Sequence, residues 1–323
     1  MLENNVFKAA NFDEADPYDM MILKQLKSQY WDPDVFPLSN DRAVWQALDP
    51  EMRTLIMRVF TGLTLLDTLQ GEIGAESLMK DATSDGEAAV WGFILMTEIA
   101  IHALSYSRVF QTLDEQQKGK PAYVWSDANP YLRQKEQIMR KYYGEGNPHK
   151  KKVATVMLES FLFYSGFFLP LWLHGQAMLT NTGDMIKTII RDEAVHGSYA
   201  GAKFQQGIAG LSEEERDDLE TWTYDLLDDL YANEIKYTEG LYADYEDLIP
   251  EVKVFLRYNA NRALMNLGYD PLFPHEEPNA MVMNGLSLDS ATHDFFSQKG
   301  AAYSMANVVP STNDTWNSQL VLK

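Results

Sequence analysis

Four acidic residues lie within strongly apolar, helix-forming segments of this 323-residue chain. They are Asp67 in FTGLTLLDTLQG, Glu98 in FILMTEIAIHALSY, Glu159 in VMLESFLFYSGFF and Glu193 in IIRDEAVHGSY. Burial of an unpaired carboxylate costs several kcal/mol, and four such costs would unfold a domain of ordinary stability, about 5–15 kcal/mol. Arg191 is the only Lys or Arg within these segments. The fold must therefore bring the four acids together with some other source of positive charge.

Two histidines share a helical face with two of these acids. Glu193 and His196 are spaced i, i+3 and Glu98 and His102 are spaced i, i+4, so each pair projects from one side of a helix. Two divalent cations would neutralise four carboxylates, and two neutral imidazoles would complete the ligand set. Because the chain has no cysteine, the ligands are limited to oxygen and nitrogen, which suit iron or manganese. This pattern is typical of ferritin-like dimetal carboxylate bundles.

Simpler explanations exist for each residue taken alone. A single Glu-x-x-His pair arises often by chance, Asp67 is compatible with a polar position at a helix end, and Glu159 would be neutralised by a partner such as Arg191. The joint occurrence of six candidate ligands on four helices favours the two-metal site. The remaining histidines are expected at surface, core or loop positions: His149, His174, His275 and His293.

Helix start signals divide most of the chain into long helices. Capping residues followed by proline predict helices from Asp49-Pro50 to about Lys80, from Asn129-Pro130, and from Asn147-Pro148 to about residue 180, the last with a kink at Pro170. Capping boxes predict helices from Ser84 to about Leu113 and from Ser212 to about Asp247. A break at Thr182-Gly183-Asp184 precedes a helix to about Ile208, and Pro250 begins a helix that ends near Gly268.

The sequence therefore predicts an all-α protein. No segment has the two-residue period of a strand, and no repeat of 20–50 residues is present. We expect one ferritin-like helical bundle with additional helices over residues 1–296. The polar, aperiodic residues 297–323 are expected to form a flexible C-terminal tail.

Charge and hydropathy exclude several classes of partner. With 27 basic against 47 acidic residues the net charge is −20, which repels nucleic acids and anionic lipid surfaces. The apolar run from Val156 to Leu179 is long enough to span a bilayer, but it contains Glu159 and His174, so a buried core helix is the better interpretation. The N-terminus does not resemble a signal peptide. We therefore expect a cytoplasmic protein that binds neither nucleic acid nor membrane.

Tyr106 lies one helical turn beyond His102, next to the candidate metal site. Phe163 and Phe167 follow Glu159 at i+4 and i+8, and Ile189 precedes Glu193 by four residues. These apolar side chains are expected to keep water away from the phenol. A tyrosine in a dry pocket beside an oxygen-activating metal pair is suited to holding an unpaired electron.

With these residues in this order, the sequence resembles the small, radical-generating subunit of class I ribonucleotide reductase, and within it the class Ib type. The matching segments are GLTLLDT, E…HALSYS, ESFLFYSGF, IIRDEAVHG, YNANRALMNLGYDP and HDFFSQKG, which extend from about residue 20 to 300. The resemblance implies a homodimeric ferritin-like bundle in which Tyr106 carries the radical. It also implies six metal ligands: Asp67, Glu98, His102, Glu159, Glu193 and His196.

The resemblance further implies an electron path through Trp31, Asp192 and His102 to a separate large catalytic subunit, which reduces ribonucleoside diphosphates. The cofactor would be two manganese ions, assembled with superoxide from a flavodoxin-like activator protein, or two iron ions assembled with oxygen. The tail 297–323 would dock on the large subunit. It offers Tyr303 and Trp316 as aromatic candidates for relaying the radical.

One departure from the family concerns the first ligand pair, which many relatives space as Glu-x-x-His. Here the pair is Glu98-x-x-x-His102; both spacings keep the two side chains on one helical face, and a local π-bulge is one way to align them. Other functions remain open on the residues alone: a dimetal oxidase of the same bundle class, a ferritin-like iron store, or a purely structural helical protein.

Overall fold

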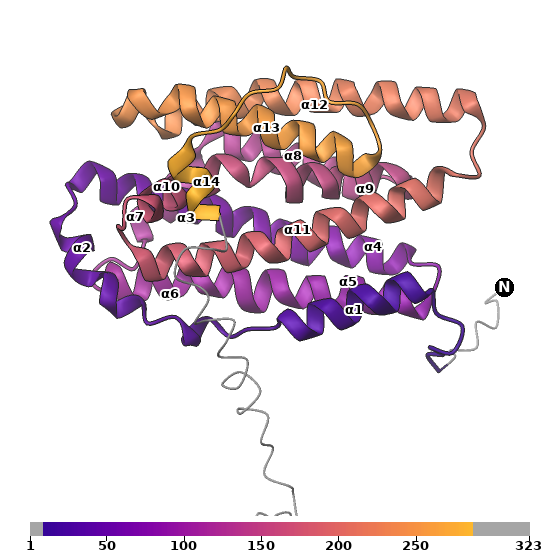
Figure 1. The fold of residues 1–323 in the computed structure, drawn as a ribbon, viewed down its shortest axis with the longest axis horizontal. Helices are drawn as coiled ribbons and strands as arrows, with labels where there is room; N and C mark the ends of the chain where they lie inside the picture. The colour runs from indigo at the N-terminus through magenta and orange to yellow at the C-terminus, as the bar shows by residue number, and fades with distance from the viewer. Residues whose placement is uncertain (1–8, 287–323) are drawn as a thin grey trace, which may run out of the picture. The chain divides into compact units, whose positions relative to one another are not determined.

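The computed structural model describes residues 9–286, and every regular element in that range is helical (Figure 1). This confirms the all-α prediction. The α-helices are α1 (Pro17–Gln29), α2 (Arg42–Ala47), α3 (Pro50–Leu69), α4 (Glu76–Asp81), α5 (Asp85–Thr97), α6 (Leu104–Leu113), α7 (Lys120–Ala128), α8 (Pro130–Gly144), α9 (Pro148–Met157), α10 (Tyr164–Gly175), α11 (Thr180–Ile208), α12 (Glu213–Leu241), α13 (Ile249–Leu267) and α14 (Ala280–Leu286). Short 3-10 segments cover Pro33–Val35, Leu38–Asp41 and Ala243–Leu248.

Several helices begin at the capping residues that the sequence indicates. The Asp49 carboxylate accepts a hydrogen bond from the Met52 amide at the start of α3. Ser212 and Glu215 form the full reciprocal capping box of α12. At α5 the predicted box is only half formed, because the Glu87 carboxylate accepts from Thr83 instead of closing back on Ser84.

Three of the four central helices are interrupted by π-helical segments: Gln70–Ala75 between α3 and α4, Glu98–Ala103 between α5 and α6, and Leu158–Leu162 between α9 and α10. The fourth central helix, α11, is continuous. The segment Glu98–Ala103 contains both Glu98 and His102. The π-bulge expected from their spacing is therefore present.

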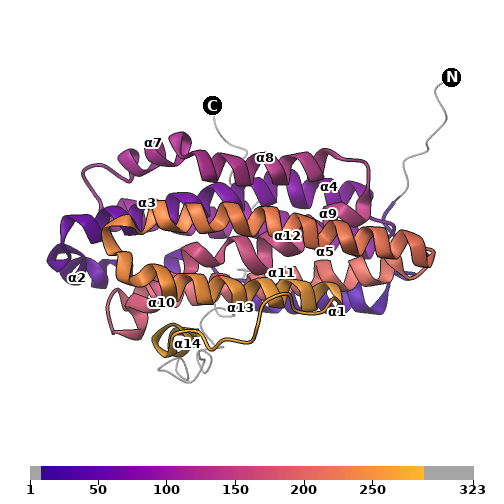
Figure 2. The same cartoon turned by 90° about the horizontal axis from the view of Figure 1, so that it is seen from above.

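The central helices pack against one another as a bundle, with α11 against α9 and α10, and α3 against the Glu98–Ala103 segment (Figure 1). Helix α1 covers α5 and α11. Helices α12 and α13 lie side by side as an outer layer (Figure 2). This arrangement places the π-helical segments in the interior.

The predicted break at Thr182-Gly183-Asp184 is wrong, because α11 begins at Thr180 and includes these residues. The chain instead turns at Ala177 and Leu179, which have φ of 58° and 46°. The Asp41 carboxylate caps the helix from a distant segment. It accepts hydrogen bonds from the backbone and side chain of both Asn181 and Thr182, at 2.7–3.2 Å.

Other predicted helix ends also differ. Helix α10 ends at Gly175 and not near residue 180, and α12 ends at Leu241 and not near Asp247. After Leu241 the chain enters the segment Ala243–Leu248, in which Tyr245 leaves the helical region with φ −138° and donates a hydrogen bond to Asp49. This tertiary contact diverts the chain toward α13.

Two helical stretches are long and apolar enough to cross a membrane by length and composition. In Pro148–Gly175, 94% of the most apolar window is buried by the rest of the protein, which supports its interpretation as a core helix. In Asp85–Leu113 only 44% is buried, so part of an apolar helix face is uncovered in one chain.

One compact unit extends through Gly285. The predicted boundary at 296 and the tail 297–323 lie outside the described residues, as do His293, Tyr303 and Trp316.

Candidate metal centre

The structure brings the six candidate ligands together in the interior of the bundle. Each is supplied by one of the four central helices, and each side chain is fully buried. Asp67 lies near the end of α3, and Glu98 and His102 lie in the π-helical segment Glu98–Ala103 between α5 and α6. Glu159 lies in the π-helical segment Leu158–Leu162, and Glu193 and His196 lie on α11.

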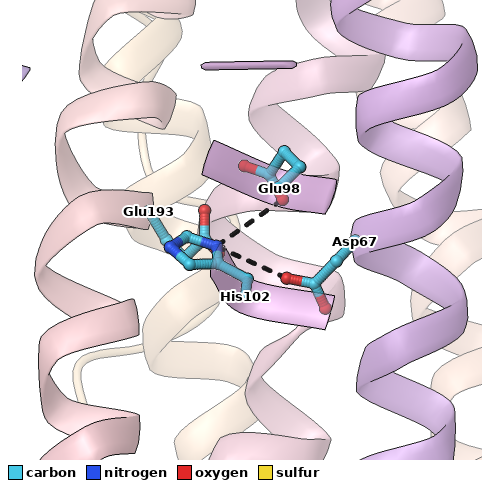
Figure 3. Close-up of side chains that lie close together, drawn as sticks. All are labelled: Asp67, Glu98, His102 and Glu193. Carbon is cyan, nitrogen blue, oxygen red and sulfur yellow. Dashed lines mark ion pairs between the residues drawn. The ribbon is translucent and has the colours of Figure 1, made fainter. Parts of the chain in front are cut away.

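The six side chains form two groups that share Glu98 and Glu193. One group adds Asp67 and His102 to the shared pair (Figure 3), and the other adds Glu159 and His196. Within each group, one candidate ligand atom from every residue lies within 4.8 Å of those from the others. Two adjacent cations that share Glu98 and Glu193 would fit this arrangement.

Short contacts connect the imidazoles to the carboxylates. His102 Nδ1 lies 2.8 Å from Glu193 Oε1 and 3.5 Å from Asp67 Oδ1. His196 Nδ1 lies 2.9 Å from Glu98 Oε1. Every carboxylate of the cluster is therefore near an imidazole nitrogen.

Many of these buried atoms still lack a hydrogen-bond partner of adequate geometry. Both oxygens of Asp67 and of Glu98, one oxygen of Glu159 and one of Glu193, and His102 Nδ1 are unpartnered among the described residues. Orphaned buried carboxylate oxygens are costly. Two divalent cations fit this donor set, because they would satisfy the free oxygens and nitrogens and neutralise the four acids.

The electrostatics agree with a site that needs cations. Burial raises the pKa of Asp67 and Glu159 well above the usual range, and the neighbouring carboxylates of Glu98 and Glu193 raise it further. Burial alone would lower the pKa of His102, but nearby carboxylates, chiefly Glu193, raise it well above the ordinary value. Without cations the cluster therefore retains protons that a metal ion must displace.

Tyr106, on α6, is fully buried, and its hydroxyl has no hydrogen-bond partner among the described residues. Burial and the charges of Asp67 and Glu193 raise the pKa of the phenol well above its usual range. Its ring stacks on Phe60, with the centroids 5.7 Å apart. Phe60 is not among the residues predicted to surround the phenol, although it lies seven residues before Asp67 and thus on the same face of α3.

The three residues proposed to surround the phenol are all buried. Phe163, Phe167 and Ile189 have no exposed surface, and the two phenylalanine rings stack on each other with centroids 5.5 Å apart. Their position around the phenol stays a prediction, whereas Phe60 contacts the phenol ring directly.

Trp31, Asp192 and His102 form a connected series. Trp31 Nε1 donates a hydrogen bond to Asp192 Oδ2 at 2.7 Å, and the same oxygen lies 3.5 Å from His102 Nε2. Arg191 donates to Asp192 Oδ1 and to the Gln29 carbonyl oxygen. The alternative in which Arg191 neutralises Glu159 is therefore wrong.

Glu159 has a different partner that the sequence analysis did not identify. Gln70 Nε2 donates a hydrogen bond to Glu159 Oε1 at 2.6 Å. The signal for Gln70 is its position three residues after Asp67, on the same helical side.

The other described histidines do not belong to the cluster. His174 lies 3.0 Å from Asp184, and His275 pairs with Glu277 on the surface. His149 lies near the start of α9.

Comparison with known proteins identifies the family. The family described as "Ribonucleotide reductase, small chain" matches residues 9–280. The chain belongs to the ribonucleotide reductase small-chain family. This membership excludes the oxidase, iron-store and purely structural alternatives.

Relatives within the family are similar over nearly their whole length. The chain is 48% identical over 306 residues to "Ribonucleoside-diphosphate reductase 2 subunit beta" of Escherichia coli K12, covering 94% of this chain and 95% of that protein. It is 47% identical over 305 residues to the subunit beta of Mycobacterium leprae, covering 94% and 93%.

A solved family structure has the same fold. The crystal structure of Streptococcus sanguinis dimanganese(II)-NrdF superimposes with a TM-score of 0.84 and 47% identity, covering 87% of this chain and all of that one. Membership of this family makes the present chain a small subunit that works with a large one.

Proposed function

We propose that this chain is the small subunit of a class Ib ribonucleoside-diphosphate reductase and that Tyr106 carries its radical. The observation that carries the proposal is the pair of four-residue groups sharing Glu98 and Glu193, beside a buried phenol without a hydrogen-bond partner. The similar Streptococcus sanguinis protein, a dimanganese(II)-NrdF, supports the cofactor. We infer two manganese or two iron ions per chain.

The chain's own residues would hold the two ions in distinct surroundings. Asp67 and His102 would bind one ion, Glu159 and His196 the other, and Glu98 and Glu193 would bridge them. Once bound and oxidised by oxygen or superoxide, the ion pair would accept one electron from the Tyr106 phenol, which loses its proton and becomes a phenoxyl radical. The apolar surroundings of Tyr106 exclude water, which protects such a radical from reduction.

Transfer of the radical out of the subunit would use the series Trp31, Asp192 and His102. Asp192 accepts from the Trp31 indole and faces His102, so it holds both rings in a fixed relation. Trp31 itself is buried, with 6% of its surface exposed. The large subunit would receive the radical and reduce ribonucleoside diphosphates to deoxyribonucleotides. Residues 297–323 are proposed to dock on that subunit.

We further propose that the enzyme is a homodimer of the cytoplasm and that its manganese form is assembled with a flavodoxin-like activator. The apolar stretch Asp85–Leu113, with only 44% of its window buried, supports association with a second copy. Leu104 on this stretch is 37% exposed.

The test is reconstitution with iron and oxygen, or with manganese and the activator, followed by electron paramagnetic resonance. The wild-type chain should give a tyrosyl radical signal. Tyr106→Phe should bind both ions and give none, whereas Tyr242→Phe, at a buried tyrosine that hydrogen-bonds the Ser165 carbonyl, should retain the signal. A radical that persists in Tyr106→Phe would overturn the assignment.

A further inference from the structure

A chain of buried hydrogen bonds leads away from one side of the metal centre. Gln70 Nε2 donates to Glu159 Oε1 at 2.6 Å, and the Tyr143 hydroxyl donates to Gln70 Oε1 at 2.6 Å. Thr155 Oγ1 lies 3.4 Å from the Tyr143 hydroxyl and donates to it. All four side chains are at most 2% exposed. The series therefore runs entirely through the protein interior.

The order of donors fixes the orientation of the Gln70 amide. A carbonyl oxygen only accepts hydrogen bonds, so the Tyr143 phenol must donate to it. The amide NH₂ group is thereby directed toward Glu159. With Glu159 ionised, as a ligand to a cation must be, the reversed amide would set its carbonyl oxygen against a carboxylate oxygen at hydrogen-bond distance, and the two oxygens would repel each other.

The local fold is shaped around this contact. Gln70 begins the π-helical segment Gln70–Ala75, and Glu159 lies in the π-helical segment Leu158–Leu162. Gly74 leaves space for both polar groups, because a Cβ atom there would lie 2.3 Å from Gln70 Oε1 and 2.9 Å from the Tyr143 ring. A larger residue at position 74 would displace the amide.

The contact makes Glu159 different from Asp67 and Glu98. Its Oε1 is occupied by Gln70, and only Oε2 is unpartnered, whereas both oxygens of Asp67 and of Glu98 are free. Glu193 also has one partnered oxygen, but its partner is the candidate ligand His196. Glu159 can therefore offer one oxygen to a cation without losing a buried hydrogen bond.

We propose that Gln70 is a positioning residue, oriented by Tyr143 and Thr155, that restricts Glu159 to one-oxygen coordination of the ion shared with His196. This inference rests on the two-ion centre of the proposed function. It makes the two ion positions unequal, because the ion beside Asp67 has no corresponding hydrogen-bonded restraint on its terminal carboxylate.

The main test is Gln70→Met, which keeps an unbranched side chain of similar length but removes the amide donor. Manganese binding to the metal-free protein is measured by stepwise titration calorimetry. Affinity for one of the two ions should fall roughly 10- to 100-fold, as is typical when a partner of a ligand is removed. The other ion should bind with nearly wild-type affinity.

Two graded variants keep the test informative if Gln70→Met does not fold. Tyr143→Phe removes only the hydroxyl that orients the amide, so it should weaken the same binding step by less than Gln70→Met does. Thr155→Val should have the smallest effect. Tyr242→Phe is the matched control for loss of a buried phenol hydroxyl, and it should leave both affinities unchanged.

A spectroscopic readout separates positioning from a general loss of packing. The electron paramagnetic resonance spectrum of the coupled dimanganese centre should change in Gln70→Met and Tyr143→Phe but not in Tyr242→Phe. Wild-type affinities and an unchanged spectrum in Gln70→Met would overturn the inference. A wild-type chain that binds two ions but forms no Tyr106 radical would instead overturn the proposed function alone.

Discussion

Metal removal should destabilise this protein by an amount set by its buried charges. Four carboxylates and two imidazoles lie fully buried with many atoms unpartnered, and cations that bind them bind only the folded chain. An ion present at one hundred times its dissociation constant stabilises the folded state by about 2.7 kcal/mol. Two ions would therefore contribute roughly 5 kcal/mol.

This free energy corresponds to a large change in melting temperature. The entropy of unfolding is about 2.1 cal/mol/K per residue, or roughly 0.7 kcal/mol/K for 323 residues, so saturation with manganese should raise the melting temperature by roughly 7 °C. Differential scanning calorimetry of chelator-treated protein, repeated with increasing Mn²⁺, measures the change. The rise should continue with the logarithm of free Mn²⁺ after the sites fill.

Variants locate the source of the stabilisation. Glu193→Gln removes a carboxylate shared by both ion positions and should lose most of the manganese-dependent rise. Asp19→Asn is the control, because Asp19 is equally buried but is paired with Lys203 and Tyr199 outside the centre. It should lower stability yet keep the full rise. A melting temperature that does not change with Mn²⁺, or a rise in Glu193→Gln equal to that of the wild type, would refute the reasoning.

Three further results are expected. The variant Trp31→Phe removes the indole donor to Asp192. It should retain both ions and the tyrosyl signal but lose ribonucleotide reduction in an assay with the large subunit. Retained activity would remove Trp31 from the path. Asp41→Ala should lower the free energy of unfolding of the metal-free protein by about 2–4 kcal/mol, because four donors at the start of α11 lose their acceptor. Urea titrations measure this change, and an unchanged urea midpoint would contradict the role of Asp41 as a helix cap. The apparent affinity for Mn²⁺ should fall as the pH is lowered. The pKa values of Asp67, Glu159 and the two imidazoles are raised, so a cation must displace protons from these groups when it binds. Calorimetry in buffers of different ionisation enthalpy should detect this proton release.

The features that could be predicted from the sequence are those with a local signal. Asp49 and Ser212 cap the helices that follow them, because a cap lies within three residues of the amides it accepts from. The spacing of Glu98 and His102, one residue longer than in many relatives, points to the π-helical turn at this position, whereas no such spacing marks the other two π-helical segments. The clustering of the six candidate ligands also follows from helical periodicity and from the cost of burying charge.

The features that escaped prediction depend on contacts between distant segments. Asp41 caps α11 from about 140 residues away, so nothing near Thr180 signals the true helix start. The Gln70–Tyr143 hydrogen bond joins residues 73 positions apart, and neither residue type is distinctive alone. Such contacts arise only from tertiary packing.

Anomalous X-ray scattering at the manganese absorption edge, from crystals of the chain loaded with Mn²⁺, would test the central claim most directly. Two peaks are expected, one beside Asp67 and His102 and the other beside Glu159 and His196, with Glu98 and Glu193 between them. A metal-saturated crystal without peaks at these positions, or with the four carboxylates turned toward solvent, would contradict the claim that paired cations permit their burial.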